Sequence, residues 1–133
     1  MKMRVVAISV HGGILVIQTR LNEKFEAYLA ADPGAAKCML TERFLALSPQ
    51  LLQRRTDRSI TAGSAGQTTP ILSQSFIIDS VTVGSIKQSD IEFVAMPLAP
   101  QAMIDGVLGV NFLRPYRVTF DFIEEWLEFD DRS

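Results

Sequence analysis

The stretch LAADPGAA, residues 29–36, carries the strongest indication of how this sequence folds. An apolar run over residues 25–31 is typical of a β-strand, and it leads directly to Asp32. Pro33 cannot donate to a strand ladder and Gly34 is free to adopt left-handed conformations, so we expect a tight loop here. The stretch therefore presents one carboxylate at a bend. An Asx-type turn, in which backbone N–H groups satisfy Asp32, is the alternative interpretation.

Short apolar and β-branched runs recur along the rest of the chain, separated by turn residues about every eight to twelve positions. They cover residues 4–10, 14–20, 60–62, 67–78, 81–83, 86–87, 91–96, 117–122 and 126–129. Short helices are expected at residues 42–47, where Thr41 is the N-cap, and 50–54, after Ser48 and Pro49. The pattern predicts an all-β barrel or sandwich with one or two short helices.

The bulk composition favours one globular domain over residues 1–133, because a 47% hydrophobic chain of this length can bury a sizeable core. A net charge of -2 gives no electrostatic reason to expect nucleic acid or an anionic membrane as a partner. No apolar run approaches the length of a membrane-spanning helix. The single cysteine, Cys38, fits a reducing compartment, so we expect a cytoplasmic protein.

Residues 25–41 resemble the active-site strand and loop of the retropepsin-like (retroviral-type, clan AA) aspartic proteases, in which apolar residues lead to Asp, Thr or Ser, Gly and Ala. Residues 105–113, with Phe120 after them, resemble the second signature of that family, two apolar residues and Gly before a short helix and a closing strand. The second signature here is Gly106, Val107, Leu108 and Gly109. The two signatures lie about seventy residues apart and in the family's order, which makes them more specific together than singly.

The resemblance implies a bacterial, single-domain member with a retropepsin-like barrel and a C-terminal helix and closing hairpin at about residues 109–129. It also implies a homodimeric aspartic endopeptidase in which water is activated between two copies of Asp32. Pro33, Gly34 and Ala35 would form the active-site loop, without any metal or cofactor. A flap hairpin at about residues 60–73 would cover a peptide or protein substrate, with Ala62, Gly63, Ser64, Ala65 and Gly66 at its tip. A plain surface hairpin is the alternative interpretation of that segment.

The active-site loop departs from the family pattern at Pro33, which stands where relatives have Thr or Ser. In the family, the hydroxyl and backbone N–H of that residue bond across the dimer axis, and proline has neither group. The alternative function is therefore a catalytically inactive retropepsin-like module that binds a peptide or a protein.

The remaining polar candidates have simpler interpretations. Cys38 has no accompanying His and Asn pattern, which disfavours a cysteine peptidase. His11 precedes two glycines and is expected in a turn, and Asn111 is expected to form a structural cap or loop hydrogen bond. Asp105 is interpreted equally as a turn former or as a site residue. No cluster of His, Cys and carboxylates has metal-ligand spacing.

Overall fold

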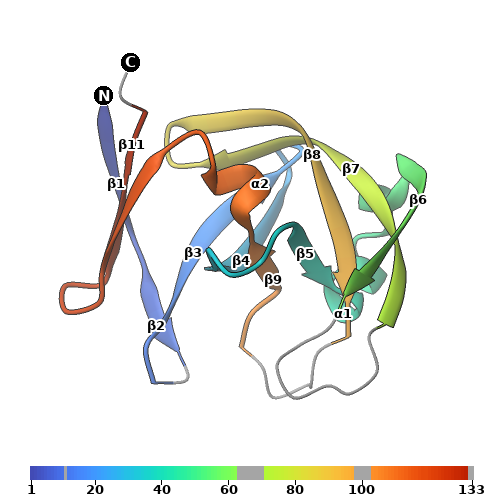
Figure 1. Cartoon of the computed structure of the whole chain (residues 1–133), viewed down its shortest axis with the longest axis horizontal. Coiled ribbons are helices and arrows are strands. Elements are labelled where there is room, and N and C mark those ends of the chain that lie inside the picture. The colour runs from blue at the N-terminus through green and yellow to red at the C-terminus, as the bar shows by residue number, and fades with distance from the viewer. Residues whose placement is uncertain (11, 63–70, 98–102, 132–133) are drawn as a thin grey trace.

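The computed structural model describes residues 1–10, 12–62, 71–97 and 103–131, and for residues 57–62 and 71–73 it describes the backbone alone. Figure 1 shows the arrangement of the elements. They are β1 (Lys2–Val6), β2 (Ile8–Val10), β3 (Ile14–Leu21), β4 (Phe25–Ala31), β5 (Cys38–Thr41), α1 (Glu42–Leu47), the 3-10 helix η1 (Pro49–Leu52), β6 (Arg55–Ala62), β7 (Ile71–Val83), β8 (Ile86–Met96), β9 (Gly106–Leu108), α2 (Val110–Leu113), β10 (Arg117–Asp121) and β11 (Trp126–Asp130).

Two sheets organise the described residues. The larger has the strand order β2-β3-β4-β9-β5-β8-β7-β6, and a further pairing between β3 and β7 closes it into a barrel. The smaller has the order β1-β11-β10 and lies to the left of the barrel in Figure 1. The chain therefore forms an all-β barrel with two short α-helices, as the sequence predicts.

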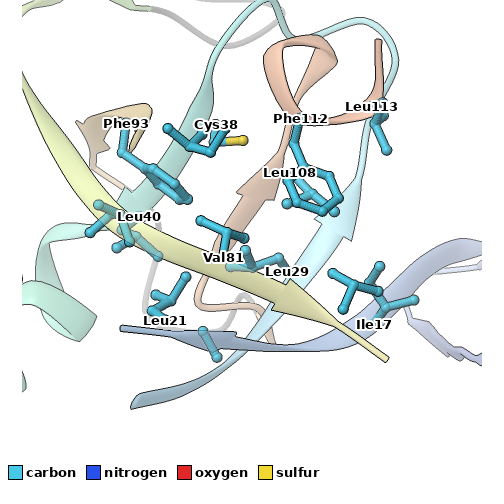
Figure 2. Close-up of a cluster of buried hydrophobic side chains, with 14 of the residues drawn as sticks. Ile17, Leu21, Leu29, Cys38, Leu40, Val81, Phe93, Leu108, Phe112 and Leu113 are labelled. Atoms are coloured by element: carbon cyan, nitrogen blue, oxygen red, sulfur yellow. The ribbon is translucent and has the colours of Figure 1, made fainter. Parts of the chain in front are cut away.

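The core fills the space inside the barrel with apolar side chains from almost every strand (Figure 2). The rings of Phe76 and Phe93 stack with their centroids 6.1 Å apart. Leu29, from the strand that leads to Asp32, and Leu108, from the second signature, are both fully buried in the same cluster. Burial of each such side chain contributes about 1.5–3 kcal/mol, so the core holds the two signature strands in place.

The helix and hairpin predictions agree with the structure in part. Thr41 caps α1 as expected, because its Oγ1 accepts a hydrogen bond from Phe44 N at 3.1 Å. The second helical segment is a 3-10 helix that begins at Pro49 and ends at Leu52, so the predicted range of 50–54 is shifted. The first two predicted runs contribute β2 and β3, which pair antiparallel with Ile8 opposite Val16.

Several predicted strand boundaries are wrong. Residues 4–10 form two strands, because Ala7 is buried and its N–H bonds to Glu125 O at 3.0 Å where the chain passes from the small sheet to the barrel. Residues 81–83 belong to β7, and residues 86–87 and 91–96 are parts of the single strand β8. Strand β5 was not expected, and β11 extends one residue beyond the predicted run of 126–129, to Asp130, which pairs with Lys2.

The flap prediction falls partly on residues outside the described ranges. Strands β6 and β7 pair as antiparallel arms, with Ala62 opposite Ile71. Gly63, Ser64, Ala65 and Gly66, like His11, lie outside the described residues. Within the part of the chain that is described, no helix has the length and apolar character needed to cross a membrane.

Candidate active site

The two predicted signatures become neighbours because β9 is inserted between β4 and β5. Strand β9 runs parallel to β4, with Ala31 paired to Leu108, and antiparallel to β5, with Met39 paired to Val107. At the end of β4, Asp32 N donates to Leu108 O at 3.1 Å. This bond places the first residue of the loop directly against the second signature.

The Asp32 loop is held by its own backbone. Gly34 N donates to Asp32 Oδ1 at 2.8 Å, and Ala35 N donates to Asp32 O at 3.2 Å. Ala35 O then accepts from Val110 N at 2.7 Å, which fastens the loop to the start of α2. The bond of the alternative interpretation, an Asx-type turn, is therefore present. It engages one carboxylate oxygen, and the Asp32 side chain stays exposed to solvent.

The glycines of the second signature allow close backbone approach at this junction. A Cβ atom added to Gly106 would lie 2.0 Å from Met39 O, and one added to Gly109 would lie 2.6 Å from Lys37 O. Side chains at these positions would collide with main-chain atoms that cannot move independently. The insertion of β9 next to β5 and the loop therefore depends on glycine at residues 106 and 109.

Asp105 and Asn111 are structural in this fold. Asp105 Oδ2 accepts from Tyr28 N at 2.8 Å, and Asp105 O accepts from Thr41 N at 2.8 Å, so this residue joins the segments on both sides of β9. Asn111 Oδ1 accepts from Cys38 N at 2.9 Å, while its Nδ2 donates to Glu92 O at 2.8 Å. The prediction for Asn111 is confirmed. For Asp105, these bonds to distant segments give a structural role that neither the turn interpretation nor the site interpretation described.

An apolar groove of about 980 Å³ opens beside the Asp32 carboxylate. Asp32 is the one ionisable side chain among its lining residues, which are Gly12, Gly13, Ile14, Leu15, Ala30, Ala31, Asp32, Pro33, Ile104, Val107, Phe120 and Phe122. The β2–β3 hairpin tip and the two phenylalanines were not predicted to reach the site. These residues are far from residue 32 in the sequence, so no local pattern indicated that they would lie near Asp32.

A second hollow, of about 400 Å³, lies on the other side of the loop. Its lining is more polar and consists of Pro33, Gly34, Ala36, Lys37, Val110, Asn111 and Arg114. Lys37 Nζ forms an ion pair with Glu92 Oε1 at 2.9 Å. Pro33 borders both spaces, so the loop separates an apolar groove from a smaller hollow with basic residues at its margin.

Comparison with known proteins places this arrangement in a family. A family described as Aspartyl protease matches residues 17–112, a range that contains both signatures. The chain belongs to the retropepsin-like aspartic protease family. No curated protein sequence matches it.

Solved structures of retropepsin-like proteins share its fold at low sequence identity. A retropepsin-like aspartic protease from Rickettsia conorii is 15% identical, with a TM-score of 0.65 over 97% of this chain and 91% of that one. The retroviral protease-like domain of Ddi1 from Leishmania major is 13% identical, with a TM-score of 0.54 over 89% and 88%. These likenesses support the fold alone. The roles of individual residues are inferred from the distances and hydrogen bonds of the Asp32 loop and the second signature.

The thiol of Cys38 in this retropepsin-like chain is buried and unreactive. Burial raises the pKa of its thiol to about 12, although Gly109 N approaches the sulfur at 3.3 Å. A thiol with such a pKa carries almost no thiolate near neutral pH, which is the form that acts as a nucleophile. The described residues also hold no group of three or more His, Cys, Asp or Glu side chains suited to a metal ion.

The raised pKa of Cys38 predicts a loss of stability at high pH. The unfolded thiol releases its proton near pH 9.0 and the folded thiol near pH 12, so the contribution is complete below pH 9.0 and falls as pH rises toward 12. We expect the free energy of unfolding to fall more steeply over this window in the native chain than in Cys38→Ala, by up to about 1.4 kcal/mol per pH unit. Urea unfolding at several pH values measures both slopes, and equal slopes would contradict the prediction.

Proposed function

We propose that this chain, as one retropepsin-like domain over residues 1–133, is an aspartic endopeptidase that works as a homodimer. The observation that carries the proposal is the exposed Asp32 carboxylate at the margin of an apolar groove, held by Gly34 N at 2.8 Å. Retropepsin-like proteins act as dimers on peptide substrates. The chain supplies one such carboxylate at this site, so two copies are needed for a pair.

In the proposed mechanism, two Asp32 carboxyl groups, one from each subunit, have different roles. Two carboxylates a few Å apart cannot easily both ionise, so at acidic to near-neutral pH one holds a proton. The ionised group accepts a proton from water while the water oxygen attacks the peptide carbonyl carbon, which the protonated group polarises. The C–N bond then breaks as its nitrogen is protonated, and the products are a carboxylic acid and an amine.

The groove beside Asp32 is suited to hold a peptide in an extended form. Its walls come from rigid strands, with Ile14 and Leu15 on β3 and Phe120 on β10. An apolar wall excludes water from the reacting bond and strengthens the interactions of Asp32 with it. We also propose that Ala62, Gly63, Ser64, Ala65 and Gly66, which the family resemblance implies are the flap, bind the substrate by backbone hydrogen bonds.

The direct test is cleavage of a peptide library by the purified chain between pH 3 and 8, with products read by mass spectrometry. We expect internal peptide bonds to be cut, with a bell-shaped pH profile because one carboxyl group must be ionised and the other protonated. A sample that is dimeric by sedimentation and cuts no peptide at any pH would overturn the endopeptidase proposal.

The alternative is a retropepsin-like module that binds a peptide or protein without cutting it, and Pro33 is the observation that favours it. Proline supplies neither the hydroxyl nor the N–H through which the family's Thr or Ser joins the two active-site loops. In this case peptides would bind in the groove with measurable affinity and be recovered intact. Isothermal titration with the same library, followed by mass spectrometry, separates the two functions.

Replacement of Pro33 isolates the effect of the missing hydroxyl. We expect Pro33→Thr to tighten the dimer and to raise kcat/KM, because threonine restores both a donor N–H and a hydroxyl at the loop. Pro33→Val is the matched control, since valine restores the N–H and has the shape of threonine without the hydroxyl. Sedimentation and peptide cleavage measure the two effects. Equal behaviour of both variants would show that the hydroxyl adds nothing here.

A further inference from the structure

The second hollow, which is lined in part by Lys37 and Arg114, has a positive charge available for a ligand. Arg114 directly follows α2, and its side chain is exposed on the margin of the hollow. Arg4, Arg20 and Arg54 each form an ion pair with a carboxylate, whereas no described acidic side chain pairs with Arg114. A guanidinium group without a counter-ion at a concave surface attracts anions.

The other polar side chains of the hollow are already held by protein contacts. Lys37 Nζ pairs with Glu92 Oε1 at 2.9 Å, so the charge of this lysine is balanced. The amide of Asn111 is held at both ends, because Oδ1 accepts from Cys38 N at 2.9 Å and Nδ2 donates to Glu92 O at 2.8 Å. A site whose walls are already ordered loses little conformational entropy on binding. Arg114 therefore supplies the net positive charge of a preorganised hollow.

The Asp32 loop joins this hollow to the apolar groove. Asp32 lines the groove, Gly34 lines the hollow, and Pro33 lines both. Consecutive Cα atoms are about 3.8 Å apart, so the Cα atoms of Asp32 and Gly34 are separated by at most about 7.6 Å. An extended peptide advances about 3.3 Å per residue, so about two or three residues of a bound peptide cover this distance. A peptide in the groove can therefore place a nearby side chain in the hollow.

The two spaces favour side chains of different charge. An acidic side chain in the groove would face the carboxylate of Asp32 and would lose its hydration against an apolar wall. In the hollow, the same side chain would meet Arg114. Guanidinium and carboxylate groups can form two parallel charge-assisted hydrogen bonds, which gives the pair both strength and a defined geometry.

We propose that the second hollow binds an acidic side chain of the peptide whose apolar side chains occupy the groove, and that Arg114 selects this side chain. The acidic residue would lie about two to four positions from the cut bond. This inference rests on the proposed function and deepens it by naming a substrate class. That class is peptides with apolar side chains at the cut bond and Asp or Glu a few positions away.

Binding of matched peptides tests the proposal without requiring cleavage. Peptides of about ten residues are long enough to cover both spaces when extended. Each has two central leucines, an acetylated N-terminus, an amidated C-terminus, and one Glu or Gln that is moved from position to position. Isothermal titration with Asp32→Asn, which should leave the peptides intact, measures the Kd values.

We expect Glu to bind about threefold to tenfold more tightly than Gln at a position two to four residues from the central leucines. The advantage should shrink as salt is added, because salt screens an ion pair at an open site. Equal Kd values for Glu and Gln peptides at every position would overturn the proposal. Tighter binding of peptides that end there with a free C-terminal carboxylate and lack Glu would also overturn it, because the hollow would then bind a chain end.

Reversal of the charge at residue 114 tests whether Arg114 makes the selection. We expect Arg114→Gln to bind Glu and Gln peptides alike, and Arg114→Glu to prefer Lys at the position where the native chain prefers Glu. The fold should persist, because the side chain is exposed and the bond from Arg114 N to Val110 O belongs to the backbone. Circular dichroism verifies this.

Arg55→Glu is the matched control for the charge reversal. Arg55 is exposed at the start of β6 and lines neither space, and its replacement changes the net charge by the same amount. This variant should keep the preference for Glu. A preference for Glu that survives in Arg114→Glu, or that Arg55→Glu loses equally, would refute the role of Arg114.

The same measurements separate failure of this inference from failure of the proposed function. Cleavage of library peptides by the native chain with no preference for an acidic residue would overturn the role of the hollow and leave the endopeptidase proposal standing. A preference for Glu in binding, with no cleavage by the native chain at any pH, would give the opposite result. A chain that neither binds nor cuts any peptide would overturn both.

Discussion

Asp32→Asn is expected to lower kcat for peptide cleavage by about a thousandfold or more, because the variant removes both the proton acceptor and the proton donor of the pair. The fold should be unaffected, since the Asp32 side chain is exposed and the amide oxygen of asparagine can still accept from Gly34 N. Single-turnover cleavage of the best library peptide measures the chemical step, and circular dichroism verifies the fold.

Asp90→Asn is the matched control for this substitution. Asp90 is an exposed carboxylate away from the groove, bonded to Arg54 Nη1 at 2.7 Å, and its φ of 57° is one that asparagine also tolerates. We expect its kcat to stay within about twofold of the native value, as for surface substitutions outside a site. Cleavage that survives Asp32→Asn would show that the activity comes from other groups or from a contaminating peptidase.

Gly106→Ala is expected to lower the free energy of unfolding by about 3 kcal/mol or more. The added Cβ would lie 2.0 Å from Met39 O, and both residues sit in strands that are paired on each side, so the backbone has little room to move. Strand β9 would have to separate from β5, which also displaces the chain that Asp32 N contacts. Urea unfolding followed by tryptophan fluorescence measures the loss.

Gly34→Ala is a useful contrast, because the Cβ atom added at residue 34 would crowd a side chain and not the backbone. The new Cβ would lie 3.1 Å from Asp32 Oδ1, the far end of an exposed side chain that can turn away. We expect the free energy of unfolding to change by less than about 1 kcal/mol while cleavage falls, since the carboxylate moves from its position. A stability loss equal to that of Gly106→Ala would show that the loop, like β9, is packed too tightly for any side chain.

The sequence predicts the fold class because strands and turns depend on local chemistry, and it indicates the two signatures through the family resemblance. A run of apolar residues before Asp32, Pro33 and Gly34 indicates a strand and a bend wherever it occurs. The N-cap at Thr41 is also predictable, since it depends on residues within one turn of helix. The contact between Asp32 and Leu108 was not predicted, because it joins segments far apart in the sequence.

Features that depend on pairing between distant strands were missed. Strand β5 has four residues and exists because β8 and β9 flank it, so its own sequence carries little signal. The strand is interrupted at Ala7 because the chain passes there from the small sheet to the barrel. The periodicity of apolar residues does not indicate such a change of sheet. Likewise, Phe122 lines the groove because of where the small sheet lies. Asp105 has a structural role because its side chain accepts a hydrogen bond from Tyr28 N.

The pairing of β1 with β11 has a consequence for biosynthesis. Lys2 lies opposite Asp130, and the N-terminal ammonium meets Asp131 Oδ1 at 3.0 Å, so β1 pairs with a strand that is synthesised much later. Contacts between segments so far apart in sequence slow folding, because a long loop must close before they form. The small sheet of a nascent chain is therefore incomplete until β11 has emerged from the ribosome.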